Sequence, residues 1–200
     1  MEIKKDSFEL KVDVQLASLE ESKKLLLSGE NEIIMGYIYK QDGKDIFEDF
    51  KDFQCITLFS NHYCCRVSNE SLLSKYMSIS LKTALKNTIG HFSMYGGEKY
   101  KKIIQAYAGE DENIDMVVYK NQLFYREQLI NGGKISIIPD IPYKDRSQIE
   151  YIHGTVDIPI KENIVREFCI IHQKNKALSE NAMEFIQLIT NYIAYNMREY

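Results

Sequence analysis

The most constraining feature of this sequence is a strand–helix–strand pattern near its start. Apolar and polar side chains alternate over residues 10–17, which is typical of a strand with one buried face. Ser18 opens a capping box, so a helix is predicted over residues 19–27, and Gly29 suits its end. A short apolar run at residues 33–35 predicts a buried strand. The pattern predicts a βαβ unit with two parallel strands in one sheet.

A second unit of the same kind follows farther along the chain. A strand over residues 114–119 leads into a helix over residues 121–130, which Gly132 and Gly133 end. The strand over residues 134–138 completes the unit. The predicted fold class is therefore α/β with an open sheet, and such sheets bind ligands at the carboxyl ends of their strands.

The rest of the chain continues this alternation. Apolar residues at helical spacing predict a terminal helix capped by Ser179. Further strands are expected over residues 56–59, 63–67, 88–92, 156–160 and 167–172, and shorter helices over residues 69–76, 80–86 and 97–108.

Composition and charge indicate an ordinary globular chain. Of the 200 residues, 44% are apolar and 27% charged, and the net charge is −4 with a pI near 5.7. A surface that neutralises several phosphates is normally basic, so this chain by itself is not expected to bind nucleic acid. We interpret the short cluster Lys99, Lys101 and Lys102 as the solvated face of a helix.

The N-terminal residues and the cysteines favour a cytoplasmic location. Residues 1–11 lack the apolar core of a secretory signal, and no run of about 18 apolar residues occurs. Cys64 and Cys65 are adjacent, which makes a mutual disulfide strained, and Cys55 and Cys169 lie in apolar segments. We expect four reduced, structural thiols.

Catalytic motifs are not found. The four histidines are scattered, with no H-E-x-x-H or Cys/His metal spacing, so no metal or cofactor is expected. A spatial grouping of Cys65 or Cys169 with a histidine and an acid stays open. The acidic loop of Asp111, Glu112 and Asp115 is interpreted as solvated rather than metal-binding. The chain is predicted not to be an enzyme.

Candidate ligand-binding residues lie where predicted strands give way to helices. Backbone N–H groups and hydroxyls at such positions hold anions and carboxylates. A plain turn or helix cap explains each candidate equally well or better, and the P-loop spacing is absent. The predicted set is Phe92, Ser93, Met94 and Tyr95 in the first-choice loop, Asn121 and Gln122 at a helix start, Gly36 and Tyr37 at a strand end, and Ser68 and Asn69 after another strand.

Four stretches, in this order, resemble the effector-binding domain of LysR-type transcriptional regulators, which has the type 2 periplasmic-binding-protein fold. They are residues 20–35 (EESKKLLLSGENEIIM), 66–85 (RVSNESLLSKYMSISLKTAL), 124–139 (FYREQLINGGKISIIP) and 168–189 (FCIIHQKNKALSENAMEFIQLI). The first is similar to the family's leucine-rich helix, Gly-acidic turn and buried strand. In the second, Glu70 and Ser71 replace the family's His-Pro. Together the stretches cover most of residues 10–190.

The resemblance implies two lobes of mixed sheets flanked by helices and joined by two crossing strands. Lobe I would comprise residues 1–63 and 170–200, and lobe II residues 68–167. The hinge strands would be residues 64–67 and 168–171. A ligand between such lobes stabilises the closed state, and the shift in population is the signal.

The resemblance implies a small-molecule effector-sensing domain in a regulator of transcription, acting as a homodimer on an effector such as a small carboxylate or an amino acid. The family's helix-turn-helix does not precede Leu10, so DNA binding is expected only through a part absent from this chain. Residues 1–9 are too few for the family's first strand and helix, so an incomplete or changed effector site is expected. Alternatives left open are a solute-binding protein of the same fold, an enzyme with a similar lobe, and a stand-alone dimerisation module with a degenerate site.

Overall fold

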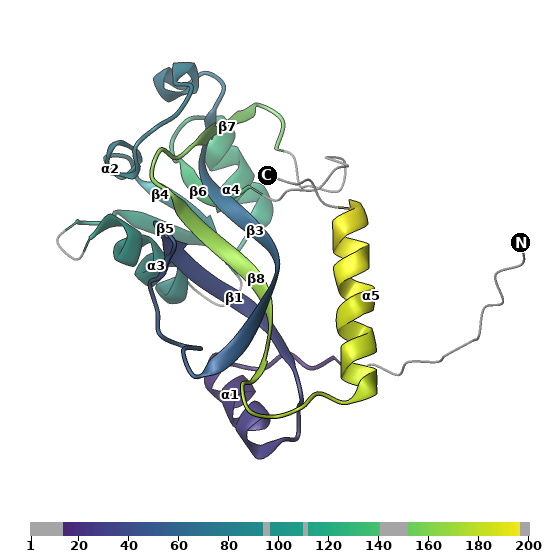
Figure 1. Ribbon diagram of the computed structural model, residues 1–200. Coiled ribbons are helices and arrows are strands. Elements are labelled where there is room, and N and C mark those ends of the chain that lie inside the picture. The colour runs from purple at the N-terminus through teal and green to yellow at the C-terminus, as the bar shows by residue number, and fades with distance from the viewer. Residues whose placement is uncertain (1–13, 94–96, 110–111, 141–151, 197–200) are drawn as a thin grey trace, which may run out of the picture.

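Two β-sheets flanked by helices organise the chain (Figure 1). The structure is a computed structural model and describes residues 14–93, 97–109, 112–140 and 152–196. The long strand β3 (Phe53–Ser68) lies in the larger sheet, pairs with β8 over its first part and with β6 and β7 over its last part, and therefore joins the two halves of the fold.

The first sheet is antiparallel and centres on β8 (Ile164–Gln173). One neighbour of β8 is β1 (Ile34–Gln41), in a register that places Tyr37 opposite Phe168. The other neighbour is the first part of β3, which carries a bulge between Thr57 and Phe59. The short strand β2 (Lys44–Asp45) forms a hairpin with the end of β1.

The second half of the fold begins where β3 changes partners. From Tyr63 onward, β3 pairs with β6 (Ser136–Pro139) on one side, and from Cys64 onward with β7 (Thr155–Pro159) on the other, both antiparallel. The strands β4 (Ile89–Phe92) and β5 (Met116–Tyr119) run parallel to each other. A parallel bridge from Ile89 to Ile135 connects β4 to the start of β6.

The predicted second βαβ unit is confirmed. It consists of β5, helix α4 (Gln122–Ile130) and β6, and β4 lies between the two strands and parallel to both. Asn121 caps α4 through its side chain, which accepts a hydrogen bond from the N–H of Phe124 at 3.0 Å. Gly132 has a positive φ of 71°, which a glycine tolerates without strain, so the predicted glycine stop is also confirmed.

Helix α1 (Leu19–Ser28) begins and ends as the sequence predicts. Ser18 accepts a hydrogen bond from the N–H of Glu21 at 3.2 Å, and Gly29 takes the left-handed conformation with φ 81°. Its single fully buried side chain is Leu26. Truncation of a buried leucine costs about 2–5 kcal/mol, so Leu26 fixes α1 to the first sheet.

Three clusters of buried apolar side chains occur among the described residues, and the two larger ones correspond to the two halves. The smaller core lies between α1 and the first sheet and is made of Leu26, Ile38, Phe50, Cys169 and Ile171. The larger core lies between the second set of strands, helix α2 (Leu81–Ala84) and helix α3 (Glu98–Ala108). Val67, Ile89, Ile104 and Ile137 are fully buried there. Because α3 belongs to this larger core, its position relative to β1 depends on how the two halves are joined.

The predicted first βαβ unit is wrong in its opening strand. Residues 14–17 form no strand, and Val14 and Leu16 are 80% and 100% exposed. Residues 10–13 of the predicted strand lie outside the described residues. The strand β1 pairs instead with β8, which is more than a hundred residues away in the sequence. The alternation within residues 10–17 shows that this segment could form a strand. Whether it pairs, and with which strand, depends on segments that are distant in the sequence.

Two other expectations needed correction. The strands predicted at 56–59 and 63–67 are one continuous strand, β3, because the polar Asn61 between them is fully buried within the sheet. The helix predicted at 69–76 is only the short 3-10 turn η1 (Leu72–Lys75), capped by Ser71.

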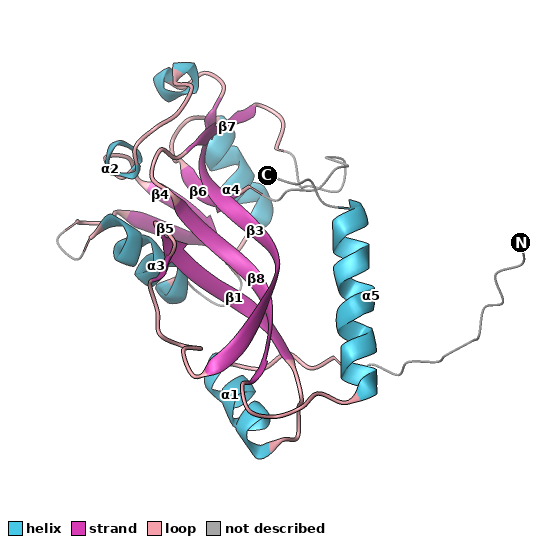
Figure 2. Cartoon of the chain, viewed as in Figure 1, coloured by secondary structure: helices cyan, strands magenta, loops and turns pink. Residues whose placement is uncertain are grey.

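The terminal helix α5 (Glu180–Asn196) packs against β3 and is shown beside the first sheet in Figure 2. Ala182 and Ile193 are buried, whereas Leu188, Tyr192 and Tyr195 are 54%, 64% and 80% exposed. Among the described residues, the helices are all too short or too polar to cross a lipid bilayer.

Candidate functional site

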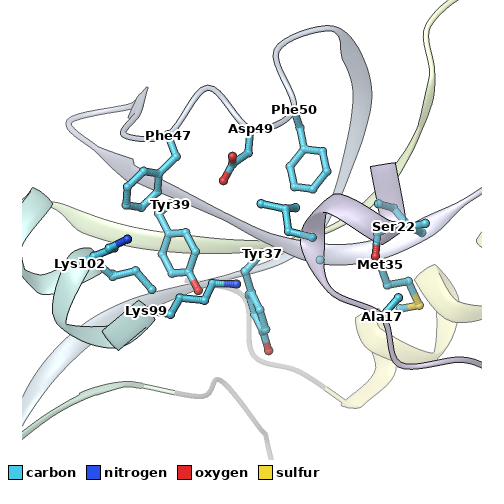
Figure 3. A pocket seen from close by; sticks show the side chains of 14 residues that line it. Ala17, Ser22, Met35, Tyr37, Tyr39, Phe47, Asp49, Phe50, Lys99 and Lys102 are labelled. Atoms are coloured by element: carbon cyan, nitrogen blue, oxygen red, sulfur yellow. The ribbon is translucent and has the colours of Figure 1, made fainter. Parts of the chain in front are cut away.

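A groove of about 460 Å³ runs beside β1, between the start of α1 and helix α3 (Figure 3). We call it the β1–α3 groove. Its lining comes from both halves of the fold, because Ile103 of α3 belongs to the larger core and Phe50 to the smaller one, while Tyr39 of β1 packs against the larger core. The lining residues are Ala17, Leu19, Ser22, Ile34, Met35, Gly36, Tyr37, Tyr39, Phe47, Asp49, Phe50, Lys99, Lys102 and Ile103.

Aromatic rings form much of the groove wall. Tyr39 and Phe47 meet edge to face, with ring centroids 6.0 Å apart. Burial raises the pKa of Tyr39, so its hydroxyl is neutral at physiological pH and is available as a hydrogen-bond donor. Phe50 packs edge to face on Phe53 at 6.1 Å. These rings offer a flat, weakly polar surface on which an apolar ligand body would lose water.

Tyr37 is held from two sides at the groove. Its ring lies 4.9 Å from that of Phe168, and the guanidinium of Arg166 lies over it at 4.2 Å. Arg166 also donates from Nε to the side-chain oxygen of Asn61 at 3.3 Å. Asn61 is fully buried and donates to the carbonyl oxygen of Asp140 at 2.9 Å. A polar chain therefore runs from the groove through β8 and β3 to the end of β6.

Positive charge lies on the α3 side of the groove. Lys99 and Lys102 are exposed, are three residues apart on α3 and so share one face of it. Neither forms an ion pair with any described residue, whereas Asp49, across the groove, pairs with Lys23 at 3.5 Å. The groove therefore presents two uncompensated ammonium groups, which would attract an anion.

The first turn of α3 contains Glu98, whose carboxylate offsets the positive end of the helix dipole. The N-cap is Gly97, which makes no side-chain capping bond. A Cβ at Gly97 would lie 2.5 Å from a methyl carbon of Val118, so close packing of α3 on β5 requires a glycine there.

Two of the predicted ligand residues, Gly36 and Tyr37, line the groove. Phe92 and Ser93 end β4 on the way to α3. Phe92 packs on Tyr125 at 6.1 Å, and the N–H of Ser93 donates to the carbonyl oxygen of Tyr119 at 3.1 Å. Met94 and Tyr95 lie outside the described residues.

The other four predicted residues lie away from the groove. The hydroxyl of Ser68 donates to the carbonyl oxygen of Ile130 at 2.7 Å, and the N–H of Asn69 donates to the carbonyl oxygen of Gly154 at 2.9 Å. Asn121 caps α4, and Gln122 is exposed in its first turn. The structure does not bring these four together with Gly36 and Tyr37, and their ligand role stays a prediction.

Sequence reasoning missed the charged and aromatic side of the groove. Lys99 and Lys102 are on an exposed helix face, as interpreted, but that face borders the groove. Their spacing of three residues, directly after a glycine pair that follows a strand, was the available signal. Tyr39, Phe47 and Phe50 gave no local signal, because residues 47–50 reach β1 only through the β1–β2 hairpin.

The thiols offer no reactive centre. The four cysteines are free, and burial raises the pKa of Cys65 to about 12 and that of Cys169 to about 11. Such thiols are protonated and weakly nucleophilic at neutral pH. No group of three or more metal-ligating side chains occurs among the residues that the structure describes.

Comparison with known proteins identifies the fold. No family model and no curated protein matches the sequence. Among solved structures, the effector-binding domain of QuiR in complex with shikimate is similar with a TM-score of 0.58 at 16% identity, over 91% of this chain and 81% of that one. Full-length CbnR complexed with its target DNA gives 0.58 at 12% identity, over 90% and 59% of the two chains. HinK, a LysR-family transcriptional regulator from Pseudomonas aeruginosa, gives 0.55 at 13%, over 87% and 56%.

The chain therefore has the periplasmic-binding-protein-like fold of LysR effector-binding domains, as the sequence resemblance implied. It spans more than half, but less than two thirds, of the length of the full-length regulators it matches. One matched chain is an effector-binding domain, and another is a LysR-family transcriptional regulator.

Proposed function

We propose that this chain is the small-molecule-sensing domain of a LysR-type transcriptional regulator and that its ligand binds in the β1–α3 groove. The observation that carries the proposal is the pair of ammonium groups of Lys99 and Lys102, which form no ion pair with a described residue and face an aromatic wall across a groove formed by both halves of the fold. A fold shared with a shikimate-bound effector domain supports a sensing role over a catalytic one.

The chemistry of the groove favours a small anion with a flat or apolar body. The two lysines attract negative charge, and the rings of Tyr37 and Tyr39 provide stacking surface. A small carboxylate or an amino acid fits this description. Such a ligand would contact β1 and α3 together, so it would favour arrangements in which the two halves are close.

The two-lobe division is part of the proposal. Lobe I would be residues 1–63 with 170–200, lobe II residues 68–167, and the hinges residues 64–67 and 168–171. The change of partners along β3, from β8 to β6 and β7, supports a boundary near Tyr63.

The partners and location follow from the same proposal. DNA would be contacted through a helix-turn-helix that these residues do not contain, in the cytoplasm. Homodimerisation is supported by the exposed apolar side chains of α5, namely Leu188, Tyr192 and Tyr195, because exposed apolar patches mark contact surfaces.

A thermal-shift panel tests the proposal. Small carboxylates, amino acids and aromatic acids are added to the chain, to the double variant Lys99→Gln/Lys102→Gln, and to the control Lys120→Gln/Lys161→Gln, which removes two exposed lysines that do not line the groove. At a hundredfold excess over Kd, a ligand stabilises the folded chain by about 2.7 kcal/mol. We expect at least one anion to raise the Tm of the chain and the control but not of the groove variant. A panel without any response, or an equal response of all three proteins, would contradict the proposal.

A further inference from the structure

The outer edge of β1 brings backbone donors and acceptors to the β1–α3 groove. The carbonyl oxygen of Tyr39 accepts a hydrogen bond from the N–H of Ile46 at 2.8 Å, so the backbone groups of Tyr39 point away from β8. In an antiparallel sheet both backbone groups of a residue point to one side, and that side alternates along the strand. The N–H and C=O groups of Met35 and Tyr37 therefore also point outward, where they form no hydrogen bond with a described residue.

The groove runs along this edge. Successive side chains of a strand point to opposite faces of the sheet, yet Met35, Gly36 and Tyr37 all line the groove. A cavity that reaches both faces of consecutive residues lies beside the strand edge and not above one face. The free N–H and C=O groups of Tyr37 are thus open to a molecule in the groove.

These two backbone groups match an α-amino acid. In a closed pair of an antiparallel ladder, one residue of the neighbouring strand accepts from the N–H and donates to the C=O of the residue opposite. A free α-amino acid has an acceptor and a donor at the same spacing, because its carboxylate and its ammonium group are attached to one carbon. A simple carboxylate has the acceptor alone and would leave the C=O of Tyr37 without a partner.

Asp49 offers a negative charge to such an ammonium group. Its side chain points into the groove from the wall opposite α3 (Figure 3). Together with Tyr37 and Tyr39 it also lines a smaller cavity of about 10 Å³, which the lysines of α3 do not line. Its Oδ1 atom pairs with Lys23 at 3.5 Å, whereas Oδ2 forms no hydrogen bond or ion pair with a described residue. The groove therefore has an acceptor for a cation as well as two ammonium groups for an anion.

We propose that the ligand of the β1–α3 groove is an α-amino acid that pairs with the free edge of β1 as a single strand residue. This ligand class rests on the sensing function proposed above. The carboxylate accepts from the N–H of Tyr37 and faces Lys99, which extends from α3 toward Tyr37 in Figure 3. The ammonium group donates to the C=O of Tyr37, on the side of Tyr39 and Asp49.

The same pairing places the side chain of the ligand. Opposed residues of antiparallel strands share one face of the sheet, so the side chain lies beside the ring of Tyr37. That ring is held by Phe168 and Arg166, and Tyr39 follows on the same face. An aromatic surface of this kind favours an apolar or aromatic side chain. The groove volume of about 460 Å³ is within the usual range of small-molecule sites.

Matched pairs of ligands test the proposal. The standard amino acids are screened by thermal shift, and each one that raises the Tm is compared with the carboxylate that lacks only the ammonium group, as L-phenylalanine with 3-phenylpropionate. We expect the carboxylate to bind at least ~10-fold more weakly, because charge-assisted hydrogen bonds are lost. Asp49→Asn should narrow this difference. The control Asp52→Asn, which changes an exposed aspartate outside the groove, should preserve it.

Hydrogen exchange followed by NMR locates the bound amino acid. We expect the amide of Tyr37 to exchange at least ~10-fold more slowly when the amino acid is bound, because its N–H then has an acceptor. The amide of Met35 lies on the same edge and serves as the internal control, since the amino acid does not bond it. Its exchange rate should stay unchanged.

The possible failures separate this proposal from the sensing function. Equal affinities within each matched pair, or a response to simple carboxylates alone, would overturn the amino-acid assignment and leave a sensor of carboxylates. An amino acid that raises the Tm without slowing the exchange of the Tyr37 amide would overturn the pairing with β1. A lack of response to every amino acid and every carboxylate would overturn the ligand class and the sensing function together.

Discussion

The guanidinium of Arg166 lies 4.2 Å above the ring of Tyr37, and this contact connects β8 to the wall of the β1–α3 groove. The same guanidinium donates to the buried Asn61, whose amide holds the carbonyl oxygen of Asp140. The orientation of a groove residue is thereby tied to β3 and to the end of β6. Tyr37 thus offers a ligand a ring whose orientation is already fixed, which lowers the entropy lost on binding.

Replacing Arg166 should weaken this arrangement. We expect Arg166→Leu to lower the free energy of unfolding by about 1–3 kcal/mol, because the cation–π contact is lost and the oxygen of Asn61 is left without its donor. Arg166→Lys should recover part of the loss, since it keeps the charge over the ring. Urea unfolding of the three proteins gives the comparison, and unchanged stability of Arg166→Leu would show that the contact has no energetic role.

A buried cation, Arg66, holds the other half together. Arg66 on β3 donates to both carboxylate oxygens of Asp157 on β7, each at 2.7 Å, and its side chain is only 10% exposed. Asp157→Ala should cost about 2 kcal/mol, below the ~3–5 kcal/mol of a fully buried pair, because the Asp157 side chain is 39% exposed. Chemical denaturation measures the change.

The control for that prediction is Glu48→Ala, which breaks the exposed pair with Lys51 and should leave stability unchanged within error. The double variant Arg66→Met/Asp157→Leu should be more stable than Asp157→Ala alone, because no charge is then left buried without its partner. If Asp157→Ala is as stable as the parent chain, the guanidinium of Arg66 does not need Asp157 as its partner, and the prediction is wrong.

The stability of the chain should fall in mild acid because of His91. Its ring stacks on Tyr100 with centroids 3.9 Å apart, and burial lowers its pKa below the ordinary value of 6.5. The unfolded chain therefore takes up a proton at a higher pH than the folded chain. The contribution of neutral His91 to the stability of the folded chain is complete above about pH 6.5. It is lost as the pH falls below that value toward the pKa of His91 in the folded chain.

Thermal melts between about pH 5 and 7.5 test this sign. His91→Gln should flatten the acid limb of the Tm profile relative to the parent chain. His153→Gln, which removes an exposed imidazole, serves as the control and should leave the limb unchanged. A profile of His91→Gln that superimposes on the parent profile would mean that His91 is protonated equally in both states.

Local signals in the sequence predicted the elements that depend on local physics. The limits of α1 follow from Ser18 and Gly29, and the second βαβ unit follows from Asn121 and the glycine stop. Pairing between distant strands has no such signal. The sequence near β1 contains nothing that selects β8 as its neighbour, so the pattern predicts that residues 10–17 pair with β1 only because they are close in the chain.

The candidate site divides in the same way. The sequence predicts Gly36 and Tyr37 at a strand end that faces a cleft; both line the groove, but they lie within β1 rather than at its end. The sequence predicts a solvated helix face for Lys99 and Lys102, which describes their exposure but not their neighbours. The approach of α3 to β1 is set by packing in the larger core, and no pattern within α3 encodes it.

The most direct measurement of the central claim uses a tryptophan placed in the groove. The chain has no tryptophan, so Phe47→Trp introduces a single reporter next to Tyr39. We predict that its fluorescence changes saturably when a stabilising carboxylate from the panel is added, and that Lys99→Gln/Lys102→Gln in the same background abolishes the change. A carboxylate that raises the Tm while the fluorescence stays constant would place the ligand elsewhere and contradict the account.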